Sequence, residues 1–120
     1  MKLVLVVVVL PGLSLALALY APFSARSALG NVSQKRSDET DTLFIKNCSS
    51  CHGNDGRAKT FKAKFNHAQD LTKPKWQASI TDEHMFLSIL KGKGKMPAFR
   101  KKLSENDIGA LVTYVRMLKR

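Results

Sequence analysis

The sequence predicts a small all-α domain of three to five short helices. Three stretches place apolar residues at helical spacing next to helix start signals, and no stretch alternates apolar and polar residues as a half-buried strand would. With 120 residues the chain has the length of one domain, which excludes the large α/β enzymes. Its 44% hydrophobic content is too high for a disordered chain and too low for a protein with several membrane spans.

Residues 1–27 are predicted to be a signal peptide or an N-terminal membrane anchor. Lys2 precedes an uncharged, mostly apolar run over 3–24, as in a secretory signal, and the small residues at 25–27 or at 16–18 are the candidate cleavage sites. The run approaches the length of a membrane span, although Pro11-Gly12 interrupts it. We favour a cleaved signal over an anchor. Both readings place the rest of the chain outside the cytoplasm, in the periplasm. A buried core helix is disfavoured because the run has no polar face.

The next segment, 28–40, is polar and lacks periodicity, which is typical of a flexible linker. The folded domain is then expected over 41–120. A core of about 80 residues usually needs extra stabilisation, and two cysteines cannot supply a disulfide framework. A buried cofactor is therefore the expected source of that stability.

The first helix is expected over 41–48, with Asp41 or Thr42 as its N-cap. Residues 53–79 are expected to form a long loop with a short helix in it, of the kind that wraps a ligand. A second helix is expected to start at Thr81 and to end at Gly92. Acidic residues follow the Thr81 cap, as is typical of a first turn.

The third helix has the clearest signals. Ser104 and Asp107 form a variant of the capping box, and basic residues occupy the last turn. Five apolar residues then fall on one helical face: Ile108, Leu111, Val112, Val115 and Leu118.

The strongest chemical signal is Cys48-Ser49-Ser50-Cys51-His52, which has the spacing of a c-type haem attachment site. Two thiols three positions apart can each add to one vinyl group of haem, and the following histidine then reaches the iron. Three alternatives use the same residues. A thioredoxin-like pair needs a βαβ context that is absent, and a disulfide within one turn would stabilise little. A zinc site would need a fourth ligand, such as His67 or His84.

Met96 is the candidate for the second axial ligand of the iron. It lies between two glycines and Pro97, in a loop that no helical pattern explains. A thioether favours ferrous iron and raises the reduction potential relative to a second histidine. Met85 and Met117 lie in predicted helices and are expected to be core residues. His67 or His84 would instead give bis-histidine ligation.

These residues together resemble the class I cytochromes c, the small monohaem proteins, and in particular the short bacterial forms. The resemblance covers 41–120 and rests on the attachment motif, on the loop 92–99, and on their order and distance. It implies a helical fold around one covalently attached haem c per chain, in which the first and last helices cross. It also implies His52 and Met96 as axial ligands. Phe44 and Tyr114 are then expected near the helix crossing, although a plain core role explains them equally well.

Two further expectations follow from the resemblance. The Nδ1 proton of His52 needs a backbone carbonyl, for which 71–74 is the expected segment. Trp76 is a candidate to contact the haem, and a core role fits it as well.

The charge predicts acidic redox partners. The chain has 20 Lys and Arg against nine Asp and Glu, a formal charge of +11. Six cations and no acid lie within 91–102, near the expected methionine side of the haem: Lys91, Lys93, Lys95, Arg100, Lys101 and Lys102. A field of this kind steers acidic proteins, although a generally basic surface is the simpler reading. Nucleic-acid binding is not expected, because the chain lacks an aromatic and basic platform.

The sequence thus predicts a monomeric one-electron carrier rather than an enzyme. One alternative is a haem enzyme or gas sensor with a labile sixth ligand. Another is a haem subunit of a larger membrane oxidoreductase, with membrane association through residues 1–24.

Overall fold

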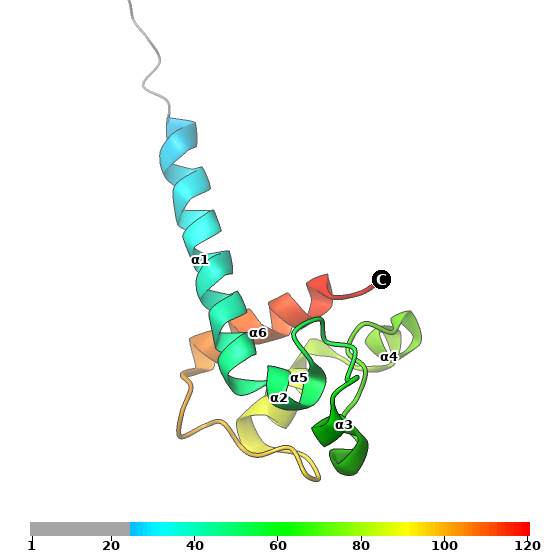
Figure 1. The fold of residues 1–120 in the computed structure, drawn as a ribbon. Helices are drawn as coiled ribbons and strands as arrows, with labels where there is room; N and C mark the ends of the chain where they lie inside the picture. Colours follow the sequence, from blue (N-terminus) through cyan, green and yellow to red (C-terminus); the bar gives the residue numbers. More distant parts are fainter. Residues whose placement is uncertain (1–24) are drawn as a thin grey trace, which may run out of the picture.

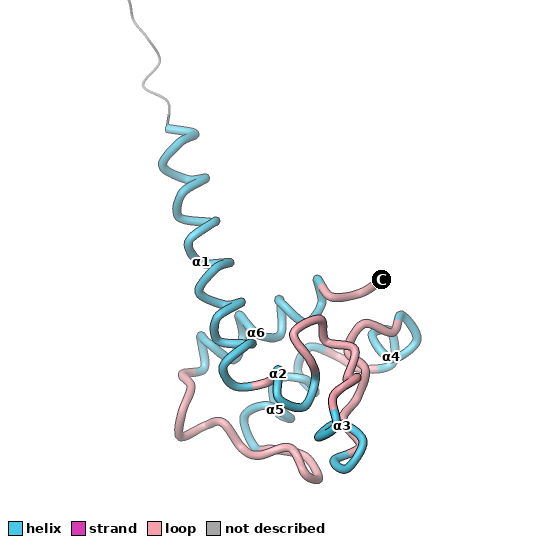
Figure 2. The backbone as a smooth tube through the Cα atoms, in the orientation of Figure 1, coloured by secondary structure: helices cyan, strands magenta, loops and turns pink. Residues whose placement is uncertain are grey.

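The structure, a computed structural model, describes residues 25–120 as an all-α fold (Figures 1 and 2). The helices are α1 (Ala25–Asn47), α2 (Ser49–His52), α3 (Phe61–Asn66), α4 (Pro74–Ser79), α5 (Asp82–Lys91) and α6 (Glu105–Met117). The predicted fold class is confirmed. The helices outnumber the expected three to five, because α2 is a single turn set off from α1 and the long loop holds both α3 and α4. Residues 1–24 lie outside the described range, and so does most of the predicted signal or anchor.

The start signals read from the sequence for α5 and α6 are confirmed. Thr81 accepts a hydrogen bond from the backbone N–H of His84 at 3.1 Å. The capping box of α6 is complete: Ser104 Oγ accepts from the Asp107 N–H at 3.1 Å, and the Asp107 carboxylate accepts from the Ser104 N–H at 2.9 Å. Gly92 follows the last residue of α5, as expected, with a φ of +79°.

The core lies where α6 packs against α1 and α5. The apolar face of α6 is buried as predicted, except that Leu118 follows the helix and is only partly buried. Phe44 of α1, 1% exposed, packs against that face. Its ring lies 4.9 Å from the ring of Tyr114, centroid to centroid, where α1 and α6 cross (Figure 1). The crossing implied by the resemblance is therefore present.

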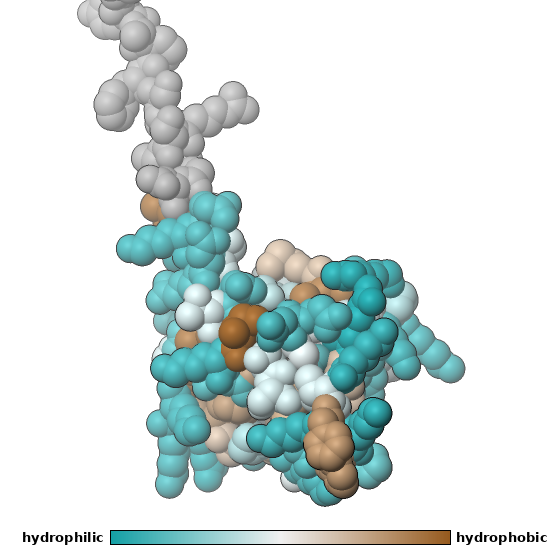
Figure 3. Space-filling view, in the orientation of Figure 1, coloured by the Kyte–Doolittle hydropathy of each residue, from teal (hydrophilic) through white to brown (hydrophobic). Residues whose placement is uncertain are grey.

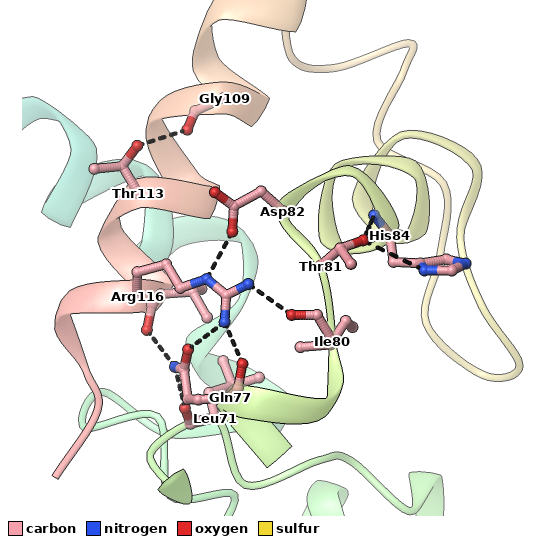
Figure 4. Close-up of polar contacts among 10 residues, drawn as sticks. Leu71, Gln77, Ile80, Thr81, Asp82, His84, Gly109, Thr113 and Arg116 are labelled. Atoms are coloured by element: carbon pink, nitrogen blue, oxygen red, sulfur yellow. Dashed lines mark hydrogen bonds and ion pairs between the residues drawn. The ribbon is translucent and has the colours of Figure 1, made fainter. Parts of the chain in front are cut away.

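A polar network around Arg116 ties α4 and α5 to α6 (Figure 4). The guanidinium of Arg116 donates to Asp82 Oδ1 and to the Ile80 carbonyl, both at 2.6 Å, and to two oxygens of Gln77. The buried Gln77 amide in turn donates to the carbonyls of Leu71 and Val115, both at 2.8 Å. One guanidinium thus joins the end of α4 and the start of α5 to α6.

The first helix begins earlier than the sequence predicted. Residues 28–40, expected to be irregular, continue α1 back to Ala25, and the expected cap at Asp41 or Thr42 is wrong. Thr42 Oγ1 donates to the Asp38 carbonyl at 2.9 Å, one turn back within the helix. The segment contains no proline and only one glycine, so the helix extends from its packed end around Phe44 into exposed residues. The domain boundary at 41 stays a prediction.

Between residues 25 and 120, no helix is long and apolar enough to span a bilayer. The exposed part of α1 is mostly hydrophilic, and it projects away from the packed helices (Figures 1 and 3).

Candidate haem site

The break between α1 and α2 places both thiols and the histidine on one turn. Cys48 precedes α2, and its carbonyl accepts hydrogen bonds from the Cys51 and His52 N–H groups at 3.1 and 2.9 Å. Both cysteines are free. Burial, with a smaller contribution from Cys51, raises the pKa of the Cys48 thiol to about 11. A redox-active dithiol needs a lowered pKa, so this environment does not favour the thioredoxin-like alternative.

His52 is oriented by a single backbone carbonyl. Its Nδ1 donates to the carbonyl of Gln69 at 2.9 Å, in the tautomer that leaves the Nε2 lone pair free. Burial lowers the pKa of His52, and the bond to Gln69 opposes that shift only partly, so the site favours the neutral ring. The expected segment, 71–74, is therefore wrong by two residues.

A cavity of about 760 Å³ lies beside this turn, within the size range of cofactor sites. Cys48, Cys51, His52 and Met96 all line it, so the structure brings the four predicted site residues together. The rest of the wall is mainly apolar. It includes Phe44, Leu71, Trp76, Ile80, Met85, Ile89, Pro97, Phe99, Leu111 and Val115.

The loop that carries Met96 is held from both sides. Lys93 and Met96 exchange two backbone hydrogen bonds of 3.1 and 3.0 Å, which form a tight turn. The Phe99 N–H donates to the Ile89 carbonyl at 3.0 Å and anchors the loop to α5. A Cβ on Gly92 would lie 2.7 Å from the Met96 carbonyl oxygen, so only glycine permits this approach. The half-buried Met96 side chain is thereby kept at the cavity wall.

The rival ligands lie differently. Met85 is buried in the core as predicted, and it also contributes to the cavity wall. Met117 is 67% exposed, so the prediction that it is a core residue is wrong, because it falls on the outer face of α6. His67 lies at the cavity edge and is exposed. Among the described residues, no three His, Cys, Asp or Glu side chains are grouped as ligands of one ion.

Comparison with known proteins decides the family. The sequence profile of the family described as "Cytochrome C oxidase, cbb3-type, subunit III" matches residues 36–115. The chain belongs to the class I cytochrome c family. Two relatives of this cytochrome are named cytochrome c6. The protein from Microcystis aeruginosa is 36% identical, over 62% of this chain and 86% of its own. The protein from Leptolyngbya boryana is 33% identical, over 61% of this chain and 81% of its own.

A solved structure supports the same assignment. The structure titled "KustC0563 c-type cytochrome" superposes with a TM-score of 0.63 at 30% identity, covering 68% of this chain and 98% of that one. The cofactor of this cytochrome is therefore covalently attached haem c, and the protein transfers electrons rather than catalysing a reaction. The cavity fits such a group, because its wall combines an apolar surface with two thiols, an imidazole and a thioether.

Sequence reasoning missed the contacts by which Thr60 and α3 support Cys51. Thr60 caps α3 by accepting from the Ala63 N–H, and its hydroxyl donates to the Cys51 carbonyl, both at 2.9 Å. Asn66 of α3 places its side-chain amide 3.6 Å from Cys51 Sγ. The threonine before two phenylalanines spaced four residues apart was the signal that could have revealed this helix.

Proposed function

We propose that this cytochrome is an exported one-electron carrier whose haem c is attached through Cys48 and Cys51, with His52 and Met96 as axial ligands. The observation that carries the proposal is the convergence of these four side chains on one apolar cavity. When bound, the haem supplies an iron that cycles between the ferric and ferrous states.

The chain's own residues favour rapid electron exchange. The Gln69 carbonyl fixes the His52 ring, and the turn between Lys93 and Met96 fixes the loop that carries Met96. Side chains held in this way move little when the charge of the haem iron changes. The apolar wall also excludes water from the site. Two protein ligands would also leave no coordination position for a substrate or a gas.

Visible spectroscopy of the protein matured in a haem-attaching host tests the ligand assignment. We expect a c-type spectrum with the weak far-red ferric band of a methionine–iron bond, and no reaction of the ferrous form with CO. Met96→Ala should lose this band and bind CO, whereas Met117→Ala, a change at an exposed methionine, should leave both properties unchanged. A band that persists in Met96→Ala would show that another residue ligates the iron. CO binding by the unmodified protein would support the gas-sensor or enzyme alternative.

The partners proposed for this carrier are redox proteins with acidic docking surfaces. The carrier is proposed to bind them as a monomer. The support is the exposed run of cations over 91–102, of which Lys93 and Lys95 reach the cavity edge. Electron-transfer rates that fall with added salt are expected. A rate independent of ionic strength would contradict this part of the proposal.

A second candidate is a haem subunit of a larger membrane oxidoreductase. The description of the matching family, which names an oxidase subunit, favours it, and so does the apolar run over 3–24. A soluble periplasmic carrier should appear in the periplasmic fraction with its first residues removed. A protein that stays with membranes through high-salt washing, with those residues intact, would favour the subunit.

A further inference from the structure

Two phenylalanines on α3, Phe61 and Phe65, are exposed to solvent. Phe61 is 77% exposed and Phe65 is 60% exposed, and their rings contact each other with centroids 4.8 Å apart. They form an apolar patch over α3 in an otherwise hydrophilic region (Figure 3). Single exposed apolar residues are common, but a pair of aromatic rings in tilted contact on a six-residue helix adds nothing to the core.

The pair lies at the edge of the haem site. Lys62 and Asn66, on the same short helix, line the cavity. Lys95 Nζ, from the loop that carries Met96, donates to the Phe65 carbonyl at 2.7 Å. This bond joins segments thirty positions apart into one surface, with the aromatic pair beside the mouth of the cavity.

The two segments that surround the phenylalanine pair carry basic residues and no acidic ones. Neither 56–69 nor 84–104 contains an aspartate or a glutamate. The exposed lysines of this surface are Lys59, Lys62, Lys64, Lys93 and Lys95. Because no carboxylate of these segments competes for them, their field is available to an acidic partner.

We propose that Phe61 and Phe65 are the apolar anchor by which this carrier docks a redox protein that bears an apolar recess bordered by carboxylates. The inference rests on the proposed carrier function and names the partner's surface. Aromatic residues dominate binding energy where they enter a pocket, while surrounding charges set orientation and association rate. Docking there brings the partner's redox centre next to the haem cavity. A lipid surface fits less well, because interfacial helices need a longer apolar face than α3 offers.

The test uses the haem-loaded protein and reduced plant-type ferredoxin, an acidic one-electron donor, as the probe. The double variant Phe61→Ser/Phe65→Ser should lower the second-order rate of electron transfer at least tenfold at low salt. Its absorption spectrum, and its reduction by the small complex hexaammineruthenium(II), should not change. Val32→Ser is the matched control, because Val32 is also exposed (62%) but lies on the projecting part of α1. We expect that control to keep the full rate.

A charge variant tests the same surface without touching the rings. Lys62→Gln/Lys64→Gln should lower the ferredoxin rate several-fold at low salt and flatten its dependence on ionic strength. Lys35→Gln, on α1, is the control and should do neither. Rates within twofold of the unmodified protein for both double variants would overturn the proposal. An unchanged ferredoxin rate combined with lost binding to anionic phospholipid vesicles would instead assign the pair to lipid.

Failure of the carrier function itself would look different. It would show as slow reduction of the unmodified protein by hexaammineruthenium(II), or as CO binding to its ferrous form.

Discussion

At the scale of single residues, the position of Met96 depends on Gly92. Its φ of +79° and ψ of 161° lie in a region that only glycine readily adopts, and a Cβ would meet backbone atoms of 96–98. We expect Gly92→Ala to lower the free energy of unfolding by about 3 kcal/mol. It should also weaken the far-red band of the ferric protein, because the loop must move. Chemical denaturation and absorption spectra measure both effects.

The matched control is Gly94→Ala in the same loop. Gly94 also has a positive φ, +59°, but a Cβ there would meet no atom within 4 Å. We expect a loss of about 1 kcal/mol from backbone strain alone, with the spectrum unchanged. Equal effects of the two substitutions would show that crowding at Gly92 does not hold the loop.

Tyr114 gives the protein a predicted alkaline sensitivity. Its hydroxyl donates to Asp41 at 2.6 Å, and burial together with this carboxylate raises its pKa to about 12. The folded state therefore binds this proton more tightly than the unfolded state, whose tyrosine titrates near 10. The contribution is complete below pH 10 and is lost as the pH rises towards 12. Tyr114→Phe should make unfolding less dependent on pH over this range, and equal slopes would contradict the assignment.

The chemistry of individual residues could be predicted where it depends on neighbours in the sequence. The spacing of Cys48, Cys51 and His52 is local, and the structure places them on one turn. The carbonyl that orients His52 could not be predicted, because Gln69 lies 17 positions further along the chain and several carbonyls fall within the same loop. The exposure of Met117 depends on which face of α6 meets the core, and the last turn of a helix shows this poorly.

At the scale of the elements, the Arg116 network adds polar contacts that join α4 and the start of α5 to α6. We expect Arg116→Met to lower the free energy of unfolding by about 2–3 kcal/mol, because it leaves the Gln77 and Ile80 carbonyls unpaired. Arg116→Lys should recover little of the lost stability, since an ammonium group cannot make the several hydrogen bonds of the planar guanidinium. Thermal or denaturant unfolding measures the change. Lys119→Met, at an exposed position just beyond the helix, is the control, and an equal loss there would contradict a specific network.

Helix boundaries could be predicted where a side chain caps the backbone. The hydroxyls of Thr81 and Ser104 lie where their sequence context placed them. The start of α1 could not be predicted in this way, because it extends from a packed turn through residues that are compatible with helix but do not require it. A short helix was expected somewhere within 53–79, but the bounds of α3 could not be predicted, because its apolar pair faces solvent rather than the core.

At the scale of the whole molecule, the core and the cofactor site are one structure. Leu71, Met85, Ile89, Phe99 and Val115 belong to the buried core and also line the cavity. The apolar residues that stabilise the fold are therefore also the residues that a haem group would pack against. Interiors packed to normal density do not tolerate open apolar space of this size.

The stability of the fold should accordingly depend on haem attachment. We expect Cys48→Ser/Cys51→Ser, which cannot attach haem, to lose most of the native stability, more than about 5 kcal/mol of the 5–15 kcal/mol typical of a domain. Its far-UV circular dichroism should show reduced helix and a broad thermal transition. Ser50→Ala changes the exposed residue between the two cysteines and should unfold like the unmodified holoprotein. A cooperative transition in the haem-free variant at the holoprotein's temperature would show that the buried core suffices to hold the helices together without haem.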